Sequence, residues 1–180
     1  MKNRPLLMEI ALTLVIIMVT ALIAWGLFLR YRTLSRHAEV PENLKLIFEG
    51  AVTFSDRTAL KRKMGKKAPW FPESSGTTPS VRCCSKGISQ PCVPGGKEFT
   101  GYSQREWQTD TWKALHFQLK DPHLFRYEFK KTSIAEYPGF YAQAYGDLNC
   151  DGKESIFRRS GQIRGGKLEP GLSIEKVQDE

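Results

Sequence analysis

The hydrophobic residues of this chain are concentrated in one long run near the N-terminus. From Leu6 to Leu29, every residue except Glu9 is apolar, a glycine or a threonine. A helix of that length, at about 1.5 Å per residue, covers roughly 36 Å, which is enough to cross a bilayer. Trp25 and Tyr31 lie where aromatic side chains are expected at the membrane surface. The pattern predicts a retained transmembrane helix, because a cleaved signal peptide has a shorter apolar core.

Beyond this span, apolar residues recur at helical spacing. They are Leu34, Ala38, Leu44, Ile47, Ala51 and Phe54. The spacing predicts that the helix continues to about Ser55 with one apolar face. Pro41 removes a backbone N–H, so we expect it to kink or divide the helix. Segment 53–65 then turns polar and basic, which predicts the helix end and a loop.

The C-terminal half predicts a small antiparallel sheet. The predicted strands cover residues 124–130, 140–148 and 155–163. Turn-forming residues at 149–152 connect the second strand to the third, which indicates a hairpin. Segment 111–119 predicts a short strand or a turn before the sheet. Such a sheet packed on the amphipathic half of the long helix gives an α+β fold.

Two segments show no regular periodicity. Residues 68–101 are rich in proline, serine, glycine and threonine, and predict a long loop in which Trp70 and Phe71 cover the core. Residues from Gly165 onward are polar and predict a loosely ordered tail.

The four cysteines predict two disulfides. They are Cys83, Cys84, Cys92 and Cys150. An even number of cysteines in an exported head is typical of an oxidising compartment. The adjacent Cys83 and Cys84 point in different directions in extended chain, so we expect one to pair with Cys92 and the other with Cys150. The sequence leaves open which is which. Zinc is the alternative, but the spacing does not fit a C-x2-C pair.

The charge of the chain is strongly positive, at +8. One basic cluster comprises Arg57, Lys61, Arg62, Lys63, Lys66 and Lys67. We interpret it as a solvated surface beside an anionic membrane, because no nucleic-acid motif accompanies it, and we predict no specific nucleic-acid partner. Basic residues also flank both ends of the span and do not settle its orientation. The predicted disulfides place the head outside the cytoplasm.

One short motif imitates a calcium loop. Asp147, Asn149 and Asp151 alternate before Gly152, as oxygen ligands do at the start of an EF-hand. The twelfth position is Arg158, where the EF-hand has a bidentate glutamate. We therefore favour a plain hairpin turn, with a weak calcium site as the alternative.

No catalytic set emerges from the sequence. His37, His116 and His123 are far apart, and we expect His116 to face outward from a strand. Nucleophile, zinc-protease and phosphate-loop motifs are missing. We expect a protein that is not an enzyme and needs no cofactor.

Several motifs carry a family resemblance. The N-terminal motifs are Pro5–Glu9, Gly26–Arg32 and Ala38–Phe48, and those of the head are Cys83–Cys84, Cys92, Trp112–Phe117, Asp121–His123 and Gly146–Gly152. The chain resembles type IV pilins in its N-terminal helix, and its head resembles pilin-like proteins of myxobacterial type. Glu9 falls at the position of the pilin glutamate that aligns neighbouring subunits. Arg4 stands where the pilin leader peptidase requires glycine, with Pro5 after it.

The resemblance implies a pilin-like structural subunit, a minor or divergent component of a pilus or pseudopilus. Its partners would be membrane lipid, other pilin subunits and the assembly machinery. It would cross a bacterial inner membrane once, with the N-terminus in the cytoplasm. Because Arg4 replaces the cleavage glycine, the alternative is an uncleaved, anchored binding or adhesion protein of pilin fold. The expected segments are a basic leader (1–4), a transmembrane helix (5–30), its continuation (31–56), a globular head (57–164) and a flexible tail (165–180).

Overall fold

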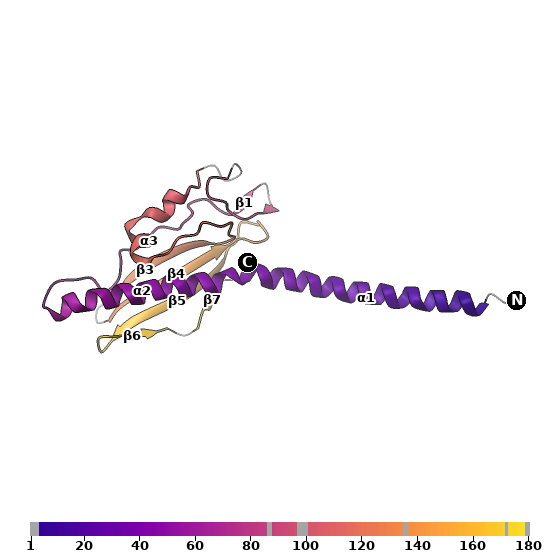
Figure 1. The fold of residues 1–180 in the computed structure, drawn as a ribbon, viewed down its shortest axis with the longest axis horizontal. Coiled ribbons are helices and arrows are strands. Elements are labelled where there is room, and N and C mark those ends of the chain that lie inside the picture. Colours follow the sequence, from indigo (N-terminus) through magenta and orange to yellow (C-terminus); the bar gives the residue numbers. More distant parts are fainter. Residues whose placement is uncertain (1–3, 86–87, 97–100, 135–136, 172, 179–180) are drawn as a thin grey trace. The chain divides into compact units, whose positions relative to one another are not determined.

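The computed structural model describes residues 4–85, 88–96, 101–134, 137–171 and 173–178 (Figure 1). The first three residues of the expected leader lie outside this part. The chain divides into two compact units, one ending at Ala38 and the other beginning at Glu39.

The first unit is one helix, α1 (Arg4–His37). Its stretch Glu9–Phe28 is long and apolar enough to cross a membrane, and all of its side chains are exposed. Thr13 and Thr20 donate their hydroxyl hydrogens to carbonyl oxygens of the preceding turn, which satisfies these polar groups within the helix. The prediction of an N-terminal helix of bilayer length is confirmed.

The second unit begins with α2 (Glu39–Lys63), after a turn at Ala38. The helix is divided close to Pro41, as expected, because α1 ends at His37 and α2 begins at Glu39. Pro41 lies in the first turn of α2, where backbone N–H groups have no partner inside the helix, so its missing N–H costs nothing. The helix end falls within segment 53–65 as predicted, but later than the expected Ser55, because α2 runs on to Lys63.

The core forms where α2 packs on a five-stranded antiparallel sheet (Figure 1). The strands are β3 (Arg126–Ile134), β4 (Tyr137–Gly146), β5 (Ser155–Arg164), β6 (Lys167–Pro170) and β7 (Glu175–Gln178). Both β6 and β7 pair with β5. The three predicted strands and the hairpin are confirmed. The tail expected to be loose instead forms β6 and β7, where backbone pairing along β5 replaces apolar burial as the stabilising contact.

Aromatic side chains fill the space between α2 and the sheet. Phe140 on β4 lies 5.5 Å from Phe48 of α2 and 4.8 Å from Phe71, measured between ring centroids. Phe71 therefore covers the core as predicted. Gly161 on β5 leaves room for the rings of Phe48 and Phe140, which a Cβ at that position would crowd.

A short 3-10 helix, η1 (Gln104–Gln108), and the helix α3 (Asp110–Leu115) precede the sheet. The expected strand or turn over 111–119 is therefore in part a helix. Thr109 caps α3 by accepting from the backbone N–H of Trp112, and Trp112 and Leu115 are buried three residues apart on one face. His116 ends the helix in the left-handed conformation and does not face out of a sheet.

The loop over 68–101 contains two short strands, β1 (Cys84–Ser85) and β2 (Ile88–Ser89). The other described residues of this loop are irregular, and some of them hydrogen-bond to β3, with mutual backbone bonds between Thr78 and Tyr127. The loop thereby covers the edge of β3, which would otherwise be open to another strand.

Candidate functional site

The two disulfides pair Cys83 with Cys92 and Cys84 with Cys150. The first closes a loop with a sequence separation of 9, and the second joins the irregular loop to the β4–β5 turn across 66 positions. Asp147 lies close to Cys84 and Cys150. Both sulfurs are already bonded to each other, so this cluster does not offer thiolates to a metal.

The oxygen atoms of the calcium-like motif bind the backbone of their own turn. Asp147 accepts from the N–H groups of Asp151 and Gly152, at 3.2 and 3.0 Å. Asn149 Oδ1 accepts from Asp151 N at 2.9 Å, and Asp151 Oδ1 accepts from Lys153 N at 2.8 Å. Such bonds are the ordinary chemistry of a tight turn. The geometry therefore fits the hairpin turn better than the calcium alternative.

The predicted assembly residue Glu9 lies at the N-terminal end of the apolar stretch of α1, and its side chain is exposed. Arg4 is the first residue of α1, and Pro5 follows in the first helical turn. These residues belong to the first unit, whereas the cysteines and the acidic turn belong to the second.

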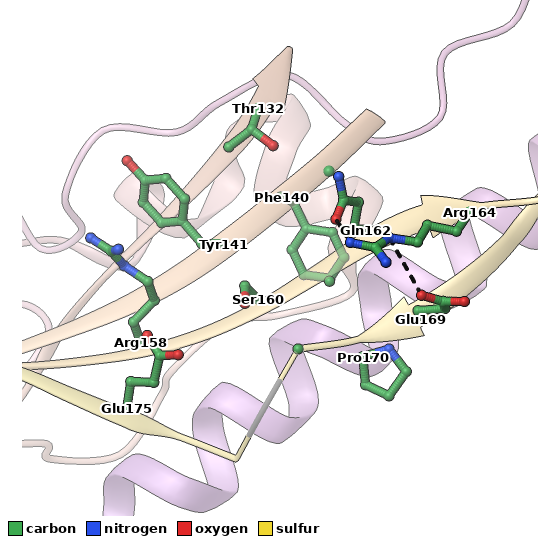
Figure 2. Close-up of a pocket in the computed structure, with 13 residues that line it drawn as sticks. Thr132, Phe140, Tyr141, Arg158, Ser160, Gln162, Arg164, Glu169, Pro170 and Glu175 are labelled. Atoms are coloured by element: carbon green, nitrogen blue, oxygen red, sulfur yellow. Dashed lines mark hydrogen bonds and ion pairs between the residues drawn. The ribbon is translucent and has the colours of Figure 1, made fainter. Parts of the chain in front are cut away.

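The face of the sheet opposite α2 carries a groove of about 410 Å³ (Figure 2). Ser160 lines its middle, and the ion pair of Arg164 with Glu169 lies at one end, with 3.6 Å between Nε and Oε2. At the other end the Arg158 guanidinium lies over the Tyr141 ring, 4.7 Å from its centroid. Strand register creates this groove, since Tyr141 is paired with Ser160 across β4 and β5.

A hydrogen-bonded row holds Arg158 in place. With its amide oxygen turned toward Arg158, Gln143 accepts from Nη2 and Nε at 2.9 and 3.1 Å and donates to the Tyr145 hydroxyl. Tyr145 in turn donates to Glu128 at 2.9 Å. Burial and the neighbouring Glu128 carboxylate raise the pKa of Tyr145. The row thereby fixes the Arg158 side chain at one end of the groove.

A buried polar relay, which sequence reasoning missed, lies beneath the irregular loop. Trp107 Nε1 donates to the Tyr102 hydroxyl at 2.9 Å, and that hydroxyl lies 2.6 Å from His123 Nε2. His123 Nδ1 lies 2.8 Å from the Phe125 carbonyl oxygen, so Nδ1 carries the hydrogen and Nε2 accepts from Tyr102. Burial lowers the pKa of His123 to about 4 and raises that of Tyr102 to about 12. The relay is neutral and structural near pH 7.

A second buried network anchors the start of α2. Glu39 accepts from the backbone N–H of Leu124 at 2.9 Å and from the Tyr127 hydroxyl at 2.8 Å. Asn43 donates to the same hydroxyl at 2.9 Å. Burial raises the pKa of Glu39, and these hydrogen bonds oppose the rise. The contact fixes the first turn of α2 to the chain just before β3.

The described residues therefore provide a helix long enough to cross a membrane, a head with two disulfides, an open groove of mixed polarity and two buried hydrogen-bond networks. The groove and the networks arise from contacts between residues distant in sequence, so no short sequence motif predicts them. Comparison with protein-family models, with curated proteins and with solved structures found no match for this chain.

Proposed function

We propose that this protein is a structural, pilin-like subunit, held in a bacterial inner membrane by α1 and presenting the head on the opposite side from the cytoplasm. The observation that carries the proposal is the pairing of an exposed apolar helix, Glu9–Phe28, with a head that contains two disulfides. An apolar surface of this length is insoluble unless lipid or copies of itself cover it.

The charge at Glu9 supports an assembly role. A carboxylate at the start of an apolar helix is costly to keep in hydrocarbon unless a positive group pairs with it. A terminal amine or a basic side chain of a neighbouring copy would supply that positive group, and the resulting ion pair would set the register of the packed helices. The resemblance to pilins suggests the same role.

The structure of the head favours a role in recognition at a surface over a role in catalysis. Its core is formed by α2 on the sheet, and the disulfide of Cys84 and Cys150 fixes the loop next to the β4–β5 turn. The groove over Tyr141 is open and lined by both apolar and polar groups, which suits recognition at a surface.

A second candidate function is favoured by one observation, the arginine at position 4. If the leader peptidase does not act there, α1 stays in the bilayer and the protein acts as a permanently anchored binding or adhesion protein of the same fold. The groove over Tyr141 would then be the recognition surface.

N-terminal sequencing of the mature protein, together with recovery of sheared surface filaments, tests the two candidates. A chain that begins at Pro5 with a methylated amine and is present in the filament fraction supports the assembled subunit. An intact Met1 in a membrane fraction without filaments supports the anchored protein. Recovery of the chain in the soluble fraction would overturn both.

A further inference from the structure

The last turns of α2 carry an exposed apolar pair among lysines. Leu60 and Met64 are 60% and 63% exposed, the two highest values among the large hydrophobic side chains described in the second unit. They are four residues apart and share one face of the helix. With successive residues about 100° apart, Lys61 and Lys63 fall on either side of that face. Arg62 falls on the opposite side.

Backbone contacts hold this region in a defined shape. Gly65 has a φ of 72°, and the N–H groups of Gly65 and Lys66 donate to the carbonyl oxygens of Arg62 and Lys61, at 2.9 and 3.0 Å. These bonds form a Schellman motif, which ends the helix and places Lys66 beside its last turn.

The side chain of Arg62 fastens the following loop to the helix. It donates to the Pro69 carbonyl oxygen at 2.8 Å and to the Ser55 carbonyl oxygen at 2.9 Å, and its guanidinium lies over the Trp70 ring. The guanidinium of Arg62 is thereby occupied by contacts within the protein. The neighbouring lysines are left at the surface of an ordered element rather than on a loose tail.

The nearby Asp56 acts electrostatically on Arg62, but the lysines of this region form no ion pair within the described part of the chain. The exposed lysines of this region are Lys61, Lys63, Lys66 and Lys67, and we call them, with Leu60 and Met64, the basic tip. No ion pair within 4.0 Å reaches any of these lysines in the described part of the chain. By contrast, Lys130, Lys131 and Arg126 each pair with a glutamate.

We propose that the basic tip docks on the surface of an anionic lipid bilayer, with Leu60 and Met64 entering the interface and the lysines contacting lipid headgroups. An apolar centre flanked by lysines is the arrangement by which interfacial helices bind anionic membranes. The long lysine stems can lie along the apolar pair while their ammonium groups reach the phosphates. This contact is additional to the α1 anchor and applies to a filament subunit and to an anchored protein alike.

The side chains favour lipid over nucleic acid as the partner. Protein surfaces that recognise nucleic acid combine cationic side chains with exposed aromatic rings or with side chains that contact base edges. The aromatic ring nearest the basic tip in sequence, Trp70, is covered by Arg62. The exposed aliphatic side chains of Leu60 and Met64 make no favourable contact with a phosphate backbone. A lipid interface would stabilise them, because it removes their apolar surface from water.

The test uses the full chain in phosphatidylcholine nanodiscs immobilised on beads. Labelled vesicles of phosphatidylcholine, with or without phosphatidylglycerol, are added and the captured label is measured. We expect capture of the anionic vesicles only. Replacing the tip lysines (K61Q/K63Q/K66Q/K67Q) should weaken capture at least about tenfold, since each lysine near an anionic surface contributes several-fold. L60S/M64S should also weaken it, by at least about tenfold.

The matched control removes the same number of charges from exposed lysines elsewhere (K113Q/K120Q/K153Q/K167Q) and should leave capture within about twofold. Equal capture of neutral and anionic vesicles, or an equal loss in the control, would overturn the proposal. Unchanged capture in L60S/M64S with displacement of vesicles by duplex DNA would reassign the basic tip to nucleic acid. A fluorophore on Met64→Cys gives a second readout, because a blue shift with anionic vesicles requires residue 64 to enter lipid.

Discussion

The hydroxyl of Tyr102 lies 2.6 Å from Nε2 of His123, inside the core and within reach of the Trp107 indole N–H. All three polar groups are partnered, and His123 is 3% exposed. A buried imidazole of this kind is stable only when neutral, because the charged form would lose its hydration and its acceptor atom.

The first prediction concerns acid stability. Burial lowers the pKa of His123 to about 4 in the folded chain, against 6.5 when exposed. The unfolded chain therefore binds more protons between these values, so the contribution of His123 to stability is complete above pH 6.5 and is lost as the pH falls toward 4. Between pH 7 and pH 5 the free energy of unfolding should fall by about 2 kcal/mol more than in His123→Gln. Denaturant unfolding in detergent measures this difference, and equal pH slopes in the two proteins would contradict it.

The second prediction ranks the two disulfides. Closing a longer loop removes more entropy from the unfolded chain, so the Cys84–Cys150 bond should contribute about 4 kcal/mol and the Cys83–Cys92 bond about 2.5 kcal/mol. Paired alanine variants of each bond, compared by thermal or denaturant unfolding, check the order. A larger loss from the Cys83 and Cys92 variant would contradict the chain-entropy account.

The third prediction concerns the packing of α2 on α3. A Cβ at Gly50 would overlap the backbone carbonyl oxygen of Leu115. Backbone cannot swing aside as a side chain can, so Gly50→Ala should destabilise the head by about 2 kcal/mol or more. The matched control is Thr53→Ala, an exposed position in the same helix, which should change stability by less than about 0.5 kcal/mol. Unfolding curves that coincide for both variants would show that α2 and α3 are not held in this contact.

The fourth prediction tests the role of Glu9. If a neighbouring copy neutralises this carboxylate, Glu9→Gln should abolish filament assembly while the chain still fractionates with the membrane, because the apolar length of α1 is unchanged. Glu42→Gln, at an exposed site on α2, serves as the control and should assemble normally. Filament recovery equal to that of the parent chain would remove Glu9 from the assembly account.

The sequence pattern predicted those helices and strands in which buried residues recur at a regular spacing. The core strands were predicted because alternating residues such as Phe125, Tyr127 and Phe129 are buried on β3 and the segment before it. The end of α2 was misplaced because its last turns project lysines and lose the apolar period, although Arg62 stabilises them from the opposite side. The strands of the tail were missed because exposed edge strands such as β7 need only backbone pairing.

The candidate sites were less predictable for a different reason. The cysteine pairing was narrowed to two options by local geometry alone. The groove over Tyr141 needs the register that places Ser160 opposite it, and the buried relay needs Tyr102 to meet His123 across 21 positions. Such contacts depend on the whole fold, and no spacing in the chain encodes them locally.

Protease protection on intact spheroplasts that express the full chain tests the central claim most directly. Protease added outside should digest the head and leave a membrane-protected fragment containing α1, because the account places one crossing at Glu9–Phe28 and the disulfide-bonded head beyond it. Full protection of the head until the membrane is opened, or release of an undigested chain into the soluble fraction, would contradict the account.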